Sequence, residues 1–370
     1  MRPLHESGRP RAPLLAMLSP TMLLPAGLLP NMLSSTRLLP ALLLTTLLSG
    51  CATSGRLSDG ERADIAGKTY VITGASSGLG RGTALRLAAL RANVVLAARR
   101  TEVLNEVAAE AERAGGRALV VTTDVSKVED VENLARTAVQ RFGRIDVWIN
   151  NAGVGAIGVF DRIPLADHAR LIDVNLKGVI YGSHVALRQF HRQGVGTLVN
   201  IGSVESEVPM AYHASYSASK AAVLSLGRAL NEELRLSGDN GTMQVATVMP
   251  WATDTPFFEH TANYSGGTPR EPAMDDPQKV VNAIVWISIH PQEELAVGWK
   301  AKASYIGHRL TPDITERVSA DISHRWQITT APPAPATSGS LYQPIPQGTG
   351  IDGGVRQRME REDTQRKNRP

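Results

Sequence analysis

The sequence predicts an α/β fold, built as a single doubly wound domain whose parallel sheet has helices on both faces. Short apolar and β-branched runs alternate with helical stretches from residue 67 to about residue 250, and this alternation is the pattern of a parallel sheet. Glycine-rich or polar turns also follow several of these runs. Ligands bind at the carboxyl ends of such strands, so the turns mark the expected site.

The first predicted strand, residues 68–73, ends in a glycine-rich turn that precedes a helix over 81–91. Glycines there let the backbone approach a pyrophosphate, whose charge meets the helix N-terminus. The spacing G-x-x-x-G-x-G differs from the common G-x-G-x-x-G, so the interpretation depends on the strand and helix around it. The predicted phosphate-binding residues are Gly74, Ser76, Ser77, Gly78, Leu79 and Gly80.

A second buried strand, residues 93–98, is followed directly by Arg99 and Arg100. An acidic residue at this strand end would bind a ribose 2′-hydroxyl, whereas arginine accommodates a 2′-phosphate. We therefore expect NADP(H) rather than NAD(H). The alternative is that both arginines face solvent at the start of a helix.

The alternation continues with helices over 102–114 and 128–142 and strands over 118–123 and 145–149. Polar turns follow both strands and are expected to line the cofactor, although Asn and Gly are also ordinary turn residues. The residues concerned are Asp124, Val125, Asn151, Ala152 and Gly153.

A long helix over 166–193 carries Asn175 in its interior. Asparagine is a poor mid-helix residue, so its presence calls for a reason. The fifth strand, residues 197–201, ends just before Ser203. Taken alone, Ser203 could be a turn serine.

Tyr216 and Lys220 lie four residues apart in a stretch with strong helical propensity, so they would share one helix face. A neighbouring cation favours the phenolate and suits the phenol to acid/base chemistry. The pair could also occur by chance in a helix. It gains weight from Ser203 and Asn175.

The sixth strand, residues 243–249, ends at Pro250 and is followed by a long irregular stretch over 251–276. Phe257, Phe258 and Tyr264 in this stretch suggest an apolar lid and a lipophilic small-molecule substrate.

The ends of the chain differ from its middle. Residues 1–51 are rich in Leu, Pro, Ser and Met and end in Leu-Ser-Gly-Cys, which resembles a bacterial lipobox with Cys51 as the lipidated residue. We expect a polar linker over 52–66, the main domain over 67–312, and a last helix with a disordered Pro/Gly-rich tail over 313–370. A membrane-anchored lipoprotein is favoured, with a cytoplasmic protein as the alternative.

Composition excludes several classes. The net charge of +4 is modest and the basic residues are scattered, so no nucleic-acid partner is expected. Cys51 is the single cysteine, which excludes disulfides within the chain and cysteine-based zinc sites. The nine histidines show no metal-ligand spacing, and no metal is expected.

The chain resembles the short-chain dehydrogenase/reductase family in the order and spacing of its motifs. These are the glycine turn, Asp124, the Asn150–Gly153 turn, Asn175, Ser203 and Tyr216-x-x-x-Lys220. The resemblance implies a Rossmann-like fold, a homo-oligomer and interconversion of a carbonyl and an alcohol. It also implies the following roles: Tyr216 as general acid/base, Lys220 as the residue that lowers the Tyr216 pKa and holds the nicotinamide ribose, Ser203 as a hydrogen-bond donor to the substrate oxygen, Asn175 as the anchor of a proton-relay water, and Pro250 and Thr253 as cofactor contacts.

One feature departs from the family pattern. Trp251 follows Pro250 where the family usually has glycine, so the loop could run differently and place an indole near the nicotinamide. Two alternatives stay open: a noncatalytic nucleotide-binding or regulatory protein on the same fold, and a related lyase or epimerase.

Overall fold

The computed structural model describes residues 57–367, which belong to one unit spanning Thr53–Pro370. Its centre is a seven-stranded parallel sheet in the order β3-β2-β1-β4-β6-β7-β9. The order reverses direction between β1 and β4, which creates the crevice where doubly wound folds bind ligands. The strands are β1 Thr69–Thr73, β2 Asn93–Ala98, β3 Arg117–Thr122, β4 Val147–Asn150, β6 Gly196–Ile201, β7 Met243–Pro250 and β9 Glu294–Val297.

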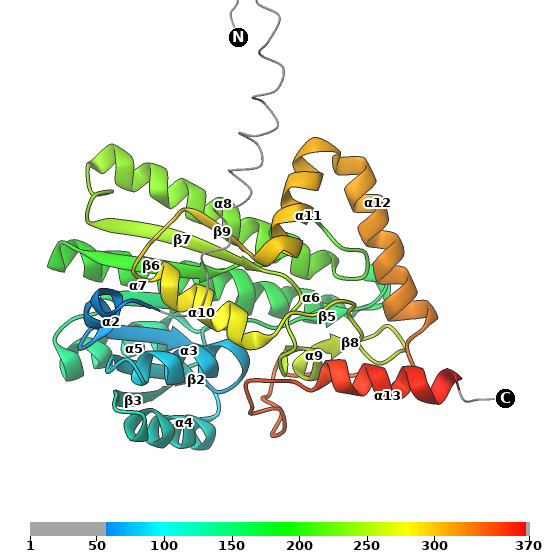
Figure 1. Cartoon of the computed structure of the whole chain (residues 1–370), viewed down its shortest axis with the longest axis horizontal. Helices are drawn as coiled ribbons and strands as arrows, with labels where there is room; N and C mark the ends of the chain where they lie inside the picture. Colours follow the sequence, from blue (N-terminus) through cyan, green and yellow to red (C-terminus); the bar gives the residue numbers. More distant parts are fainter. Residues whose placement is uncertain (1–56, 368–370) are drawn as a thin grey trace, which may run out of the picture. The chain divides into compact units, whose positions relative to one another are not determined.

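Helices cover both faces of the sheet (Figure 1). One apolar cluster joins the sheet to α3 Gly78–Ala88, α4 Thr101–Arg113 and α10 Pro277–Ile287. The other cluster joins it to α5 Val128–Phe142, α7 Gly178–Gln193 and α8 Ala214–Ser237. The central strand β1 is buried at every position, as expected for a strand covered on both sides. The predicted doubly wound fold is confirmed.

The helix predicted over 166–193 contains a π-helical segment. It is divided into α6 Leu165–Ile172, η3 Asp173–Lys177 and α7, and Asn175 lies within η3. Single π turns inside α-helices are frequent at functional sites. The Asn175 side chain is satisfied by hydrogen bonds to Val154, outside the helix, which offsets the poor helical propensity of asparagine.

The irregular stretch after β7 contains the short helix α9 Phe257–His260 and the strand β8 Ala262–Asn263, which pairs with β5 Ala156–Ile157. Two helices, α11 Gly298–Leu310 and α12 Pro312–Ser323, follow β9 and form a hairpin beside the end of α8 (Figure 1). The helix α12 continues into the π-helical segment η5 His324–Thr329.

Two predictions about the connecting segments are wrong. The expected linker contains the helix α2 Asp59–Ile65, which starts with a capping box at Ser58. The expected disordered tail packs on the domain, with Leu341 fully buried, and ends in the helix α13 Val355–Lys367. The tail is ordered by backbone contacts with distant side chains, which its local composition does not reveal.

The leader and Cys51 lie outside the described residues. Within residues 57–367, no helix is both long enough and apolar enough to cross a membrane.

Candidate active site and cofactor cleft

The predicted site residues meet in one cavity of about 490 Å³ at the carboxyl ends of the strands, a size typical of small-molecule sites. Most of the predicted catalytic and cofactor residues line it. The exceptions are Gly80, which packs against the Gly74 carbonyl from the first turn of α3, and Asn175, which lies behind the cavity wall. The predicted residues that line the cavity are Gly74, Ser76, Ser77, Gly78, Leu79, Arg99, Arg100, Asp124, Val125, Asn151, Ala152, Gly153, Ser203, Tyr216, Lys220, Pro250 and Thr253.

The glycine turn between β1 and α3 has no room for side chains at two positions. Gly74 has φ +69, and a Cβ there would lie 2.9 Å from the Ala152 Cα. At Gly80, a Cβ would lie 2.3 Å from the Gly74 carbonyl oxygen. The glycines therefore permit a tight turn that presents the N-terminus of α3 to the cavity, where a phosphate is favoured.

The turn after β4 is tied to the end of β1. Thr73 Oγ1 accepts hydrogen bonds from the backbone amides of Asn151 and Ala152, both at 3.0 Å. The Asn151 side chain donates in return to the Thr73 carbonyl at 2.9 Å. These contacts fix the two turns that flank the crevice relative to each other.

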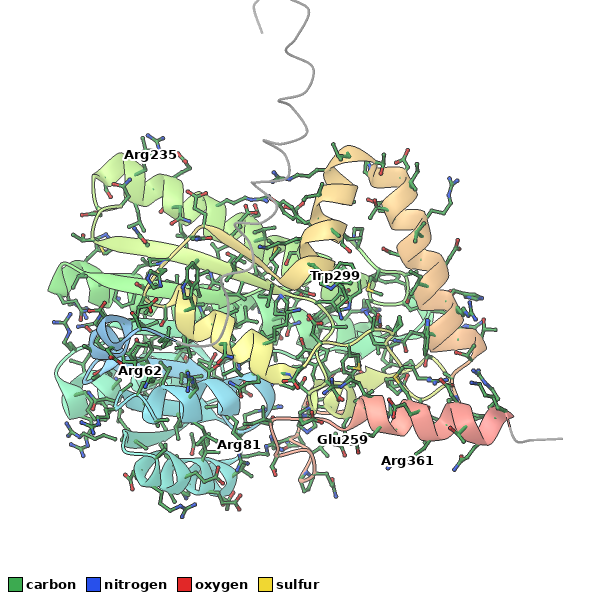
Figure 2. All side chains as sticks on the ribbon, viewed as in Figure 1. Arg62, Arg81, Arg235, Glu259, Trp299 and Arg361 are labelled. Carbon is green, nitrogen blue, oxygen red and sulfur yellow. The ribbon has the colours of Figure 1, made fainter. Side chains whose placement is uncertain are left out.

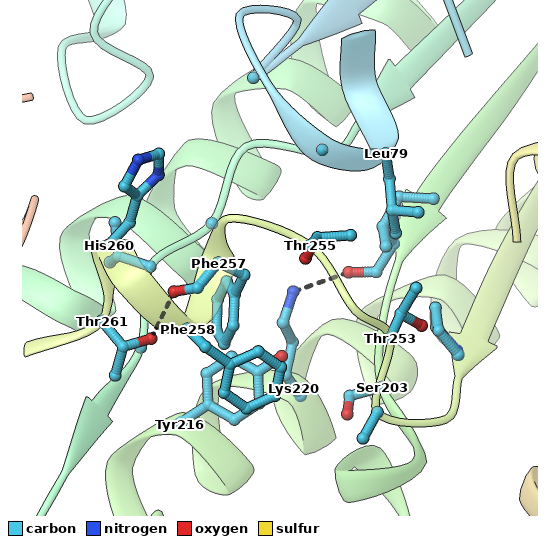
Figure 3. A pocket seen from close by; sticks show the side chains of 18 of the residues that line it. Leu79, Ser203, Tyr216, Lys220, Thr253, Thr255, Phe257, Phe258, His260 and Thr261 are labelled. Carbon is cyan, nitrogen blue, oxygen red and sulfur yellow. Dashed lines mark hydrogen bonds between the residues drawn. The ribbon is translucent and has the colours of Figure 1, made fainter. Parts of the chain in front are cut away.

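Tyr216 and Lys220 project from one face of α8 into the cavity (Figure 3). The Lys220 Nζ lies 5.7 Å from the centroid of the Tyr216 ring and donates to the Ile201 carbonyl at 2.8 Å. Burial lowers the pKa of Lys220 to about 8, and Glu205 opposes this shift. Burial raises the pKa of Tyr216 and Glu205 raises it further, whereas a hydrogen bond with Ser203 lowers it. The phenol is therefore protonated at neutral pH in this structure.

Ser203 is held by the first turn after β6. It caps η4 Val204–Ser206, and its Oγ accepts from the Glu205 amide at 3.1 Å. This cap leaves the Ser203 hydroxyl beside the Tyr216 phenol. Two hydroxyl groups thus converge on one point of the cavity.

Asn175 connects three elements from behind the cavity. Its side chain is fully buried and bonds both the amide and the carbonyl of Val154, at 2.8 and 2.9 Å, and the Ser219 hydroxyl at 3.2 Å. It therefore links the turn after β4 to α8, the helix that carries Tyr216. In this structure Asn175 acts as a positioning residue.

The apolar lid lies where it is expected, with one exception. The Phe257 ring packs against Tyr216 in a tilted arrangement, with 5.5 Å between the ring centroids, and Phe257 and Phe258 both line the cavity (Figure 3). Tyr264 instead donates a hydrogen bond to Asp167, away from the lining residues. Trp251 lines the cavity, and its indole donates to the Ala273 carbonyl at 3.1 Å.

A buried polar cluster in the cavity wall was not predicted. Glu205 accepts from Ser217 at 2.6 Å and pairs with the His213 ring at 3.1 Å. Burial raises the pKa of Glu271, which also lines the cavity, to about 7. The sequence signal was a carboxylate two positions after Ser203. Glu271 lies in the irregular stretch and carried no signal.

The tail after η5 also reaches the cavity, which was not predicted from the sequence. Ser340, Pro344 and Ile345 line the cavity together with the glycine turn. Their only local signal is an apolar Leu-Tyr-Gln-Pro-Ile-Pro run inside a Pro/Gly-rich segment.

Comparisons with known proteins identify a family and several similar chains. The short chain dehydrogenase family model matches residues 68–264. The oxidoreductase YxnA of Bacillus subtilis strain 168 is 34% identical over 278 residues, covering 74% of this chain and 78% of that protein. The 3beta-hydroxysteroid dehydrogenase 1 of Eggerthella lenta is 40% identical over 196 residues, covering 52% of this chain and 74% of that protein.

Solved structures are similar as well. An alcohol dehydrogenase from the archaeon Thermococcus sibiricus, complexed with 5-hydroxy-NADP, is 28% identical with a TM-score of 0.53, covering 62% of this chain and 94% of that chain. A short-chain dehydrogenase from Streptomyces avermitilis is 29% identical with a TM-score of 0.57, covering 68% and 97%.

The chain belongs to the short-chain dehydrogenase family. It is an oxidoreductase that acts on CH–OH or carbonyl groups of a small molecule and uses a nicotinamide cofactor. The residues of the cleft fit such a cofactor, because the tight glycine turn, the helix N-terminus and the two arginines all face one cavity.

Proposed function

We propose that the protein is an NADP(H)-dependent oxidoreductase that interconverts a lipophilic ketone or aldehyde and the corresponding alcohol, with Tyr216 as general acid/base. The observation that carries this proposal is the shared cavity. Tyr216, Ser203 and Lys220 meet at one end of it, and Arg99 and Arg100 line it together with the glycine turn.

The bound nicotinamide supplies or accepts the hydride. For reduction, the Tyr216 phenol donates its proton to the carbonyl oxygen, and it takes a proton back from the alcohol in the reverse direction. The Ser203 hydroxyl donates a hydrogen bond to the same oxygen and stabilises the charge that develops there. The Lys220 ammonium, 5.7 Å from the phenol ring, favours the phenolate that remains after proton donation.

The arginines at the end of β2 support NADP(H). Burial lowers the pKa of Arg100, and so do the neighbouring charges of Arg99 and Arg81. These cations repel one another, so a dianionic 2′-phosphate placed among them would be strongly favoured. Arg100 also donates to the hydroxyls of Ser76 and Ser77 at 3.1 and 3.0 Å, which orients it towards the phosphate-binding turn.

The substrate end of the cavity supports a lipophilic compound. Its lining includes Val208, Met210, Trp251, Phe257 and Ile322, and such side chains bind apolar surface. The similar Eggerthella lenta protein is named as a hydroxysteroid dehydrogenase. A compact polycyclic or branched aliphatic ketone is the class of substrate that we propose for this chain.

The test is a fluorescence titration of the full chain with NADPH and, in parallel, with NADH, followed by a screen of lipophilic ketones, aldehydes and secondary alcohols. We expect tighter binding of NADPH and turnover of at least one carbonyl compound. Equal or reversed cofactor preference would contradict the NADP(H) assignment. Binding of neither cofactor would contradict the enzymatic role.

We also propose a homo-oligomer that pairs through α7 and α8. One side of α8 exposes a row of small residues, Ala214, Ala218, Ala221 and Ser225, at helical spacing, and small residues allow a second helix to approach closely.

We further propose that Cys51 is lipidated and that the protein is anchored to a membrane. This proposal rests on the Leu-Ser-Gly-Cys sequence alone. Incorporation of labelled palmitate that is lost in Cys51→Ala would support it. Absence of label in the parent protein would contradict it and leave the cytoplasmic alternative.

A further inference from the structure

The C-terminal tail crosses the cofactor cleft and bonds the two arginines at the end of β2. Arg99 donates to the carbonyls of Ser340 at 2.6 Å and Tyr342 at 3.0 Å. Arg100 donates to the carbonyls of Ile345 at 3.0 Å and Gln347 at 3.1 Å. Both guanidinium groups are thus held in place by backbone oxygens more than 240 residues away in the sequence.

The same segment also contacts the phosphate-binding turn. The amide of Gly78, the first residue of α3, donates to the Gly350 carbonyl at 2.8 Å. Arg81 on the next turn of α3 donates to the Thr349 carbonyl at 2.8 Å, and Figure 2 shows this side chain pointing towards the tail. Residues 340–350 therefore form a strap that runs along the nucleotide end of the cleft.

The strap is anchored at both ends outside the cavity. At its start, Leu341 is fully buried in the core cluster of α5, α6 and α7, and its carbonyl accepts from Arg170 at 2.9 Å. Beyond its end, the buried Asp254 carboxylate accepts from the Val355 amide at 2.8 Å and from Arg356 Nε at 2.9 Å. The anchors make the strap part of the folded domain.

The strap borders the cavity but does not fill it. Ser340, Pro344 and Ile345 of the strap line the same cavity of about 490 Å³ as Arg99, Arg100, Ser76 and Ser77. A guanidinium has five donors. Arg99 gives three of them to strap carbonyls and keeps two for a ligand. Arg100 holds the strap with two and bonds Ser76 and Ser77 with the other three, so a phosphate would reach Arg100 by replacing these serine hydroxyls.

We propose that residues 340–350 are a cofactor-binding strap, which closes over the adenosine end of NADP(H) and orients Arg99 and Arg100 for the 2′-phosphate. This inference rests on the proposed NADP(H) dependence. If the arginine side chains are already oriented before the cofactor binds, less conformational entropy is lost on binding. The affinity for NADP(H) is raised both by closure of the strap and by the oriented arginines. The affinity for NAD(H), which lacks the 2′-phosphate, is raised by closure alone.

The test compares dissociation constants of NADPH and NADH for the full chain and for variants with a loosened anchor. Leu341→Ser removes the buried anchor. Arg356→Gln weakens the other anchor at a half-exposed side chain outside the cavity, and it keeps the test valid if Leu341→Ser fails to fold. Gln343→Ala, at an exposed strap position, is the matched control.

We expect the loosened variants to bind NADPH about tenfold more weakly, the equivalent of one or two net hydrogen bonds, and NADH only about threefold more weakly. The control should bind like the parent. Unchanged affinities in the loosened variants would contradict the cofactor-binding role of the strap. Tighter NADPH binding would also contradict it, because it would show that the strap competes with the cofactor phosphates. Neither result would affect the proposed function. A parent that binds neither cofactor would overturn the proposed function itself.

Hydrogen exchange measured by mass spectrometry gives an independent readout. Closure predicts that NADPH slows exchange of the amides in residues 340–350, and that NADH slows it less. Faster exchange in this segment on addition of NADPH would show displacement and would contradict closure.

Discussion

At the scale of single residues, Tyr216 and Lys220, the proposed catalytic pair, lie in an environment that opposes charge. Burial lowers the pKa of Lys220 to about 8 and raises the pKa of Tyr216. At neutral pH the phenol therefore keeps its proton, and Lys220 lies close to the pH at which it loses one. The Lys220 bond to the Ile201 carbonyl and the Ser203 contact with the phenol fix the positions of the two groups, as the proposed proton donation requires.

Glu271 provides a test of this buried electrostatics. Burial raises its pKa from 4.5 to about 7, so between these values the folded state keeps a proton that the unfolded state releases. Stability therefore falls as the pH rises through this window. Glu271→Gln should be more stable than the parent at pH 8, by roughly 1–3 kcal/mol, and equal to it at pH 4.5.

Urea unfolding at both pH values measures this difference, with the exposed Glu293→Gln as the control. If the Glu271→Gln variant is no more stable than the parent at pH 8, the raised pKa of Glu271 is contradicted.

At the scale of elements, α13 is docked by a buried cation. The Arg270 side chain is 1% exposed, donates to Asp363 at 2.6 Å and to the Thr330 carbonyl at 2.9 Å, and lies 5.2 Å from the Trp326 ring centroid. Removing one partner of a buried ion pair costs about 3–5 kcal/mol, and the partial exposure of Asp363 places this case at the lower end.

Arg270→Met should therefore destabilise the protein by about 3 kcal/mol and make the Arg and Lys sites of α13 more sensitive to trypsin. Arg361→Met, at an exposed position of the same helix (Figure 2), should change neither property. Equal cleavage rates in the parent and Arg270→Met would show that the ion pair does not dock the helix.

The elements that could be predicted from the sequence are those with strong local patterns. The β-branched runs at β1 and β2 and the glycine turn between β1 and α3 were found because strand propensity and turn chemistry act over a few residues. The strand β9, Glu294–Val297, was missed, since four residues without β-branched alternation carry little signal.

The tail was assigned wrongly for another reason. The tail is ordered because its backbone carbonyls accept hydrogen bonds from Arg99, Arg100 and Arg81, which are distant in the sequence. Every residue has a backbone carbonyl, so composition cannot predict such contacts. In the site, the residues with distinctive chemistry were located, whereas Glu271 and Ile345 enter the cavity only through tertiary packing.

At the scale of the whole molecule, we expect the protein to assemble through the small-residue side of α8. Ala221→Arg would place a long charged side chain in that interface, where burial of an unpaired charge is unfavourable. Light scattering after size exclusion should then give the mass of a single chain. Ala109→Arg, on the exposed side of α4, is the control and should keep the parent's mass. A parent that is already monomeric would contradict the assembly.

The central claim is that Tyr216 moves the proton in a reaction driven by a bound nicotinamide. The most direct measurement combines NADPH affinity and turnover for Tyr216→Phe, with the carbonyl compound that the parent reduces fastest. The variant loses a single hydroxyl and keeps the ring that packs on Phe257. We predict NADPH binding within about threefold of the parent and turnover lower by about 10²–10⁴-fold. Retention of most of the turnover would contradict the assigned role.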